Sequence, residues 1–347
     1  MRIAMLAPVW VAVPPEGYGG IELVVSLLTE ELVARGHDVT LFASGGSRTK
    51  ATLRTVFDEP PTDRLWETEP DASHVGAAYR AVAREYADEH AFDIVHDHTD
   101  YLGAAFAATL PTPVVHTVHF PLEEPRGSFL RRFADDVYLA AISDFQRSAA
   151  PDLPWAGMVH NAVDTEAFEF RTRKDGYLLC IGRICERKGQ DVAVQVARRS
   201  GCRLVLAGRV HPKERDFFAE RVLPHIDGDQ IVFEGEVPND RKRELMAGAS
   251  ALLLPVREPE PFGLVMVEAF ASGTPVIATP LGAVKEIVTD GVTGFLSGSV
   301  KGMAAAAADR LGEIDPERCR AEAAERFDPR AMADGYEELY QSVLGGL

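Results

Sequence analysis

Two basic residues, Arg183 and Lys188, lie in the loop 182–189 between an expected strand and an expected helix. Arginine presents a planar fork of N–H donors and lysine a compact charge, and a diphosphate group binds well to both. The pair is conspicuous because the chain has 36 basic and 53 acidic residues, a formal net charge of −17. Such a charge repels nucleic acids, so an anionic ligand must be held by a local cluster of this kind. The alternative, that both side chains are simply solvated at the surface, stays open at this point.

Two carboxylates follow in the second half of the chain. Glu260 lies in the loop after the apolar stretch 251–256, and Glu268 lies in the helix that Gly263 begins. Ionised carboxylates accept hydrogen bonds from hydroxyl groups, and the free N–H groups at a helix start bind phosphate. Hydroxyl, phosphate and hydroxyl in a row is the layout of a nucleotide sugar. A glycosidase pair is the alternative, and it would need both carboxylates to flank one bond within about 10 Å.

A glycine-rich loop, residues 16–22, follows the first expected strand and contains Gly19 and Gly20. Glycine lets the backbone approach a ligand closely, and the helix start favours an anionic group. A nicotinamide dinucleotide site would need the spacing G-x-G-x-x-G and an acidic residue after the second strand, where Ser44 and Gly45 stand instead. The loop is therefore either a plain turn or a contact with a different ligand.

Histidines gather in the first half of the chain, at His96, His98, His116 and His119. We expect His119, at the end of a strand, to be a hydrogen-bonding or general acid/base group, and the other three to be structural. A zinc site is disfavoured because the histidines lack the H-E-x-x-H pattern and a cysteine partner.

Short apolar strands alternate with amphipathic helices, which is the pattern of an α/β protein with parallel sheets covered on both faces. In the first half the expected strands are 3–7, 38–43, 94–97, 113–117, 137–142 and 155–160. In the second half they are 177–181, 202–207, 231–234, 251–256 and 276–278. Ligands of such sheets bind beyond the carboxyl ends of the strands, which is where the clusters above fall.

A chain of 347 residues is long enough for two domains. The polar stretch 164–176 has no clear periodicity, so we place a linker there and expect domains over residues 1–168 and 169–328. A final helix over 329–347 should pack back on the first domain, because it carries one apolar stripe made of Met332, Tyr336, Leu339, Tyr340 and Val343. Two doubly wound domains that face each other would create a cleft for the ligand.

The four cysteines, Cys180, Cys185, Cys202 and Cys319, show no metal-binding or C-x-x-C spacing, which favours reduced thiols and the cytoplasm. Prolines interrupt the apolar start of the chain, so it is a better first strand than an export signal. No apolar stretch reaches the length of a membrane span.

Taken in order along the chain, these motifs resemble the retaining glycosyltransferases of family 4. The matching motifs are Gly19-Gly20-Ile21-Glu22, His116-Thr117-Val118-His119, His160-Asn161-Ala162-Val163-Asp164, Gly182-Arg183 with Lys188-Gly189, Glu260-Pro-Phe-Gly-Leu-Val-Met-Val-Glu268, Ser272-Gly273-Thr274-Pro275-Val276-Ile277 and Gly291-Val292-Thr293-Gly294-Phe295. The Glu-x7-Glu element with the Arg–Lys pair is the specific part. The chain departs from the family at Ala162, where glycine is usual, and in 282–286, where a second glycine is common.

The resemblance implies the GT-B fold, in which two Rossmann-like domains bind a sugar donor mostly through the C-terminal domain. It implies that Arg183 and Lys188 hold the diphosphate, that Glu268 binds the ribose hydroxyls and that Glu260 binds a hydroxyl of the transferred sugar. Further contacts to phosphate, sugar and acceptor are implied for Phe262, Gly263, Leu264, His119, Gly19 and Gly20. Among these, His119 would lie near the reacting carbon.

The activity implied by the resemblance is transfer of a hexose from a UDP-glucose-like or GDP-mannose-like donor to a hydroxyl group. The acceptor stays open between a glycan, a lipid and a small molecule, and a lipid would bring the protein to the inner face of the membrane. Two fixed cations can stabilise a departing diphosphate, so neither a metal nor a cofactor is expected. Retention in such enzymes is usually attributed to a front-side reaction, which needs no protein nucleophile. A nucleotide-sugar 2-epimerase of the same fold and a non-catalytic nucleotide-sugar-binding protein are the rival interpretations.

Overall fold

The computed structural model describes residues 1–17, 19–65 and 67–346, and the chain divides into two compact units. Unit 1 comprises Met1–Ala162 together with Pro329–Leu347, and unit 2 comprises Val163–Asp328. The chain thus passes from unit 1 to unit 2 earlier than the sequence predicted, at residue 163 instead of residue 169. Among the described residues, no helix is both long enough and apolar enough to cross a membrane.

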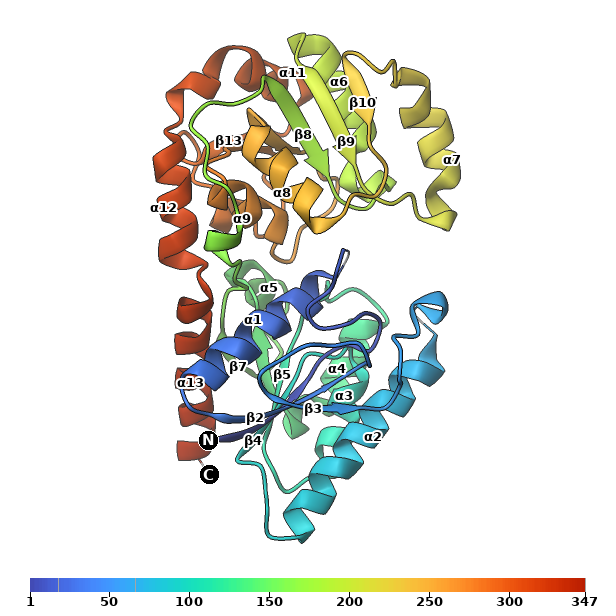
Figure 1. Ribbon diagram of the computed structural model, residues 1–347, viewed down its shortest axis with the longest axis vertical. Coiled ribbons are helices and arrows are strands. Elements are labelled where there is room, and N and C mark those ends of the chain that lie inside the picture. Colours follow the sequence, from blue (N-terminus) through green and yellow to red (C-terminus); the bar gives the residue numbers. More distant parts are fainter. Residues whose placement is uncertain (18, 66, 347) are drawn as a thin grey trace. The chain divides into compact units, whose positions relative to one another are not determined.

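Unit 1 is a seven-stranded parallel sheet with the order β3-β2-β1-β4-β5-β6-β7 (Figure 1). Its strands are β1 Arg2–Leu6, β2 Asp38–Ala43, β3 Thr52–Thr55, β4 Ile94–Asp97, β5 Val114–Thr117, β6 Tyr138–Ala141 and β7 Trp155–Met158. The central strands are buried along almost their whole length, as expected of a parallel sheet that is covered on both faces. Strand β3 lies at the edge of the sheet and is partly exposed, and its short polar sequence gave no apolar signal.

The helices of unit 1 are α1 Gly20–Ala34, α2 Thr68–Ala87, α3 Leu102–Ala107, α4 Arg126–Phe133, α5 Asp144–Ala149 and α13 Pro329–Gly345. Helix α1 buries Val24, Val25 and Leu28 and ends where Gly36 takes a positive φ of 88°. The N–H groups of Gly36 and His37 then bind the carbonyls of Val33 and Leu32, which is the Schellman arrangement that a glycine after a helix favours.

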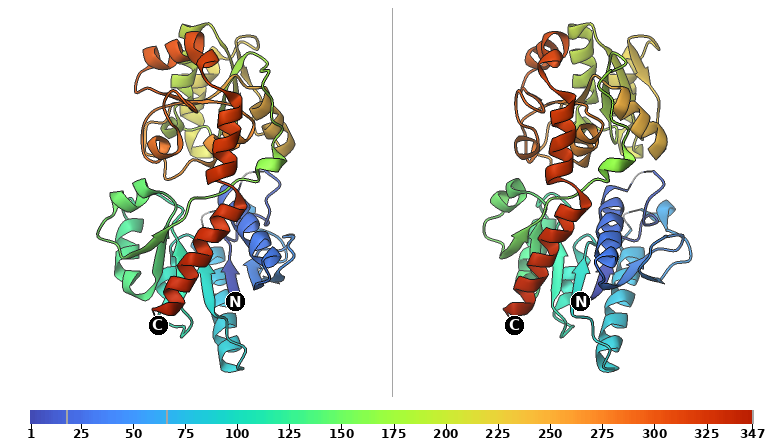
Figure 2. Two further views of the ribbon diagram at one scale, coloured as in Figure 1. Left: turned by 90° about the vertical axis from the view of Figure 1, so that its left-hand side faces the viewer. Right: turned by 60° about the vertical axis from the view of Figure 1, so that its left-hand side comes forward.

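Helix α13 is the last element of the chain and packs against α1 and β7 of unit 1 (Figures 1 and 2). Its predicted apolar stripe is its buried face, and Gly157 on β7 lies so close to Leu339 that a Cβ there would be 3.0 Å from Cδ1. At the polar edge of the contact, Arg35 forms ion pairs of 2.6 Å with Asp334 and 2.7 Å with Glu337. The C-terminal segment therefore completes the core of unit 1.

Unit 2 is a six-stranded parallel sheet with the order β10-β9-β8-β11-β12-β13. Its strands are β8 Tyr177–Ile181, β9 Arg203–Ala207, β10 Ile231–Phe233, β11 Ala251–Leu254, β12 Val276–Ala278 and β13 Gly294–Leu296. The α-helices are α6 Gln190–Ser200, α7 Arg215–Phe217, α8 Asn239–Gly248, α9 Leu264–Ala271, α10 Val284–Ile287, α11 Val300–Ala305 and α12 Pro316–Arg326. Strand β13 was not predicted. It begins at Gly294, where a Cβ would be 1.9 Å from the carbonyl oxygen of Val276 on β12.

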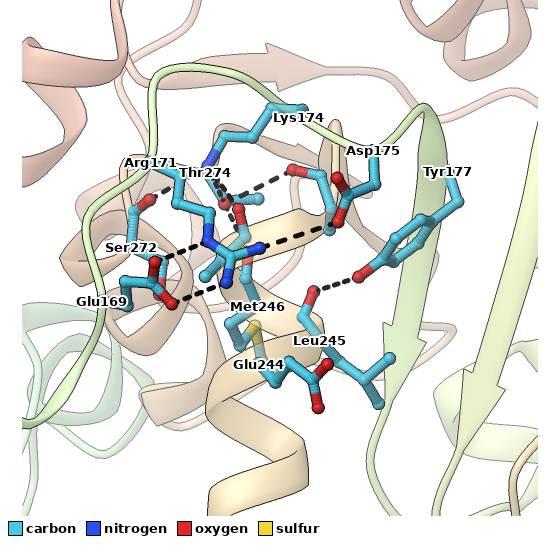
Figure 3. A network of polar contacts seen from close by, with 12 residues as sticks. Glu169, Arg171, Lys174, Asp175, Tyr177, Glu244, Leu245, Met246, Ser272 and Thr274 are labelled. Atoms are coloured by element: carbon cyan, nitrogen blue, oxygen red, sulfur yellow. Dashed lines mark hydrogen bonds and ion pairs between the residues drawn. The ribbon is translucent and has the colours of Figure 1, made fainter.

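The polar segment predicted to be a linker is instead attached to unit 2 (Figure 3). Lys174 Nζ donates hydrogen bonds to the carbonyls of Ala247 (3.1 Å) and Ser272 (2.9 Å) and to Thr274 Oγ1 (2.8 Å). The backbone N–H of Asp175 binds the carbonyl of Gly248 at 2.8 Å. Charged side chains without periodicity predict a loop, but the sequence does not show that Lys174 binds three acceptors elsewhere in unit 2.

Replacing Lys174 with alanine should lower the free energy of unfolding by about 2–3 kcal/mol, because partly buried acceptors would lose a charged donor. Urea unfolding of the full chain measures the change. Lys301→Ala is the matched control, because Lys301 is an exposed lysine of the same unit and its loss should change stability little. Equal unfolding midpoints for the two variants would contradict the anchoring role of Lys174.

A second buried ionisable group lies in the first turn of α1. Glu22 is 6% exposed, and burial raises the pKa of its carboxyl group to about 7. The native state then binds a proton that the unfolded state releases between about pH 4.5 and pH 7. The contribution of Glu22 to stability is therefore full below pH 4.5 and is lost as the pH rises through 7.

Glu22→Gln should therefore be more stable than the wild type at pH 8, by up to about 3 kcal/mol, and close to it at pH 5. Thermal or urea unfolding at the two pH values measures this difference. The control is Glu16→Gln, since Glu16 is an exposed acid near the same helix start. A stability difference from the wild type that is the same at both pH values would contradict the raised pKa.

Candidate functional site

The candidate residues of unit 2 follow two neighbouring strands at the centre of its sheet. Strands β8 and β11 pair with each other, and the chain continues from β8 to β9 on one side and from β11 to β12 on the other. Such a point, where the strand order reverses, opens a crevice beyond the carboxyl ends in doubly wound sheets. The loop after β8 carries Arg183 and Lys188, and the loop after β11 carries Glu260.

The loop after β8 is held by a residue that the sequence analysis did not identify. Gln190, at the start of α6, is 1% exposed. Its side chain accepts a hydrogen bond from the N–H of Cys185 at 3.2 Å and donates one to the carbonyl of Arg183 at 3.1 Å. Gly189 precedes it with a φ of 71°, and a Cβ there would be 2.1 Å from the carbonyl oxygen of Pro255. Glycine is therefore required where the loops after β8 and β11 meet.

Lys188 and Glu260 form a close ion pair that joins these two loops. Their side chains are 22% and 11% exposed, so the charges are partly removed from water and attract strongly. Arg257 reinforces the junction, because its guanidinium binds Asp191 at 2.6 Å and the carbonyl of Glu186 at 2.7 Å. The structure thus brings two of the predicted site residues into direct contact.

The Arg183 side chain lies in the same loop and is half-buried. Within the described part of the chain, no ion pair involves its guanidinium, whereas the nearby Arg187 pairs with Glu258 at 3.4 Å. Arg183 is therefore the cation of this loop whose charge is not matched by an acidic side chain among those residues.

The second carboxylate of the Glu-x7-Glu element is held by a different cation. Glu268, on α9, is 5% exposed, and its Oε1 is 2.7 Å from Nζ of Lys242 on α8. Lys242 was not predicted from the sequence, because it stands in the run Arg241-Lys242-Arg243, which is typical of a solvated helix face. The spacing of the pair, 26 residues, gives no local signal.

The start of α9 follows Gly263, which has a φ of 90°. Phe262 is 2% exposed and packs with a ring distance of 5.8 Å against Phe327 of the same unit, and Leu264 is the first residue of the helix. The backbone of Glu260 is fixed by a bridge to Gly282, whose Cβ, if present, would be 2.4 Å from the Glu260 carbonyl oxygen. The glycine retained in the segment 282–286 thus has a structural reason.

In unit 1 the glycine loop follows β1 and leads into α1. Tyr18 lies outside the described residues. Gly19 has a φ of 148°, and a Cβ there would be 2.8 Å from Cβ of Pro15, so only glycine fits without movement. Gly20 is the first residue of α1. Glycine at position 19 therefore has a structural reason, and a contact of Gly19 or Gly20 with a ligand stays a prediction.

His119 follows β5 and is held by a second histidine from the segment after β4. Its Nε2 lies 2.8 Å from Nδ1 of His98, and the two rings stack. Burial, together with the nearby His116, lowers the pKa of His119 to about 3, so the imidazole is neutral. Within the residues described, no group of three or more His, Cys, Asp or Glu side chains is arranged to hold a metal ion.

Two glycosyltransferase family models match consecutive segments of the chain. The model described as "Glycosyltransferase Family 4" matches residues 18–166, and the model described as "Glycosyl transferases group 1" matches residues 164–330. A phosphatidyl-myo-inositol mannosyltransferase of Mycolicibacterium smegmatis is 27% identical over 99% of this chain and 95% of its own length. A glycogen synthase of Mycobacterium tuberculosis is 26% identical over 100% of this chain and 96% of its own.

Solved structures of the same fold can be superimposed on the whole of this chain. AviGT4, a glycosyltransferase involved in avilamycin A biosynthesis, has a TM-score of 0.77 and 26% identity, with 100% of this chain and 99% of that chain covered. Sucrose-phosphate synthase from Thermosynechococcus elongatus has a TM-score of 0.80 at 20% identity, with both chains fully covered, and so shows the fold alone. The chain is a glycosyltransferase of the GT-B fold, and it resembles the enzymes of glycosyltransferase family 4.

Proposed function

We propose that this glycosyltransferase moves a hexose from a UDP-glucose-like or GDP-mannose-like donor to an acceptor hydroxyl, with retention of configuration and without a metal. The observation that carries the proposal is the ion pair of Lys188 and Glu260, which joins the loops after β8 and β11, together with Arg183 in the first of these loops. This arrangement supplies two cations for a diphosphate and a carboxylate for a sugar hydroxyl.

The diphosphate is assigned to Arg183 and Lys188. The bond from the sugar to the diphosphate breaks during transfer, and negative charge builds up on the departing oxygen. Fixed cations stabilise that charge without having to reorganise at the moment of reaction. Lys188 has three N–H donors, so it can keep Glu260 as one partner and bind phosphate with the others.

The nucleoside is assigned to Glu268. Lys242 binds Oε1 of this carboxylate, which leaves Oε2 to accept hydrogen bonds from ribose hydroxyls. Burial of a carboxylate without a partner would be costly, and Lys242 supplies that partner. The backbone N–H groups near Phe262, Gly263 and Leu264 are assigned to phosphate and sugar, because they lie at the start of α9.

Unit 1 is assigned the groups that meet the reacting carbon and the acceptor, namely His119, Gly19 and Gly20. A neutral His119 can accept a hydrogen bond from a sugar hydroxyl or donate one to it, and it adds no charge to the site. In a front-side reaction the leaving phosphate takes the acceptor proton, so no side chain has to act as a nucleophile. Two known proteins support the choice of donors. HepE from Anabaena, a solved structure of the same fold, was determined in complex with UDP and glucose, and the mannosyltransferase noted above transfers mannose.

Glu260→Gln and Lys188→Ala should each reduce transfer at least about 100-fold, because each removes one half of the pair assigned to the sugar and the leaving group. The measurement is release of UDP or GDP from the donor, with the fold checked by circular dichroism and by the unfolding midpoint.

Glu258→Gln and Arg187→Ala are matched controls, since they break the neighbouring ion pair between the same two loops. Both controls should retain turnover within about threefold, as expected for a more exposed pair. Near-normal turnover by Glu260→Gln, with the fold intact, would contradict the assignment of this site.

A panel of UDP- and GDP-sugars tested by thermal shift should identify the donor, because a ligand that binds only the native state at about 100 times its Kd adds about 2.7 kcal/mol of stability. Glu268→Gln should lose most of this shift, whereas Glu258→Gln should keep it. Proton NMR of the anomeric signal in the product then tests retention, and inversion would contradict it.

A further inference from the structure

Behind His119, a row of buried polar side chains leads to the last helix of the chain. The row joins residues from β4, β5 and α13 of unit 1, and its members are His119, His98, His96, Thr117, Tyr336 and Tyr340. All except His119 are 0% exposed. His119 is partly exposed and is the end of the row from which a ligand could be reached.

Each neighbour in the row is within hydrogen-bonding distance of the next. His119 Nε2 is 2.8 Å from His98 Nδ1, and His98 Nε2 is 3.3 Å from His96 Nδ1. The hydroxyl of Tyr340 lies 2.5 Å from the same His96 Nδ1. On the other side of the ring, His96 Nε2 is 2.8 Å from Thr117 Oγ1, which is 3.0 Å from the hydroxyl of Tyr336.

The three histidines of the row are neutral. Burial is the main cause that holds the pKa of His96 and of His98 well below its usual range, and the nearby histidines add to it. Burial also lowers the pKa of His119 to about 3. A neutral imidazole has one nitrogen that donates and one that accepts. The proton on one ring therefore fixes which nitrogen carries the proton on the next.

The proton order follows from the contact at Tyr340. A phenol hydroxyl is a better donor than acceptor, and an unprotonated imidazole nitrogen is a good acceptor, so we assign Tyr340 as the donor to His96 Nδ1. His98 Nε2 faces that same nitrogen at 3.3 Å, and two unprotonated nitrogens would repel each other there, so we assign the proton to His98 Nε2, which shares the lone pair with Tyr340 and leaves His98 Nδ1 unprotonated. Only a protonated His119 Nε2 can complete the row.

We propose that His98, His96 and Tyr340 are positioning residues that hold His119 in the tautomer with a proton on Nε2. The unprotonated Nδ1 of His119 is then the atom left to accept a hydrogen bond from a hydroxyl of the substrate. This inference rests on the role assigned to His119 under the proposed function. It adds that a hydroxyl group of the C-terminal helix sets the state of that residue.

The neighbouring pair of His116 and Asp97 is separate from the row. His116 Nδ1 lies 3.6 Å from Asp97 Oδ2, and Tyr79 donates a hydrogen bond of 2.9 Å to the same carboxylate oxygen. Tyr79 is thus a buried tyrosine of unit 1 whose hydroxyl contacts a polar group outside the row. It supplies a matched control for Tyr340.

Nitrogen NMR of the full chain, with 15N-labelled histidine, tests the proton order directly. In the wild type, the His119 signals should be those of a single tautomer with Nε2 protonated and Nδ1 unprotonated. Tyr340→Phe removes the hydroxyl but keeps the ring, and it should shift the nitrogens of His96 and, through His98, those of His119. Tyr79→Phe should leave the His119 signals unchanged.

Turnover supplies a second readout, measured as release of UDP or GDP from UDP-glucose and GDP-mannose. Tyr340→Phe should lower kcat about 10-fold and leave the donor KM within about twofold, the size of effect typical of a group that orients another. Tyr79→Phe should leave both values unchanged. A Tyr340→Phe variant with wild-type kcat and unshifted His119 signals would overturn the proposal.

His119→Ala separates this proposal from the proposed function. Loss of turnover in His119→Ala together with normal turnover in Tyr340→Phe would overturn the positioning role alone. Normal turnover in His119→Ala would overturn the role of His119 and the positioning proposal with it, while the Lys188 and Glu260 variants would still test the donor site.

Discussion

The ion pair of Lys188 and Glu260 is the contact on which the candidate site of unit 2 depends. It joins the loop after β8 to the loop after β11. These two strands are neighbours, but the chain runs from β8 toward β9 and from β11 toward β12, in opposite directions across the sheet, so the sheet alone does not hold the two loops together. Gly189 allows the close approach, and Arg257 adds hydrogen bonds from one loop to the other. A partly buried pair of opposite charges then fixes both side chains in a geometry that neither loop would maintain by itself.

Buried acids are handled in two different ways in this strongly acidic chain. Glu260 and Glu268 each pair with a lysine, and under the proposed function each accepts hydrogen bonds from hydroxyl groups of the donor. Glu22 pairs with no cation among the described residues, and burial raises its pKa instead. The first solution preserves an acceptor for a ligand, whereas the second makes the stability of α1 depend on pH.

The architecture was predictable because its main elements are signalled locally. Apolar runs marked the central strands, and one apolar stripe marked the buried face of α13. Strand β3 was missed because it lies at an edge and needs no apolar sequence, and the linker was misplaced because the three hydrogen bonds of Lys174 reach residues far along the chain. Arg183, Lys188 and Glu260 were predicted because loops after strands carry function in this class of sheet, and their roles stay predictions. Lys242 and Tyr340 were not predicted, because a basic run and an apolar stripe are normally structural and only the tertiary structure shows their contacts with Glu268 and His96.

Unit 1 is built from two segments of the chain, and all of unit 2 is inserted between them, after Ala162 and before Pro329. During synthesis on the ribosome, β1 to β7 emerge first but remain without the apolar cover that α13 provides over β7 and α1. Unit 2 is contiguous and has its complete sequence available before α13 is made. The maturation of unit 1 therefore waits for α13 to be translated, and a nascent chain released before α13 would expose an uncovered apolar surface.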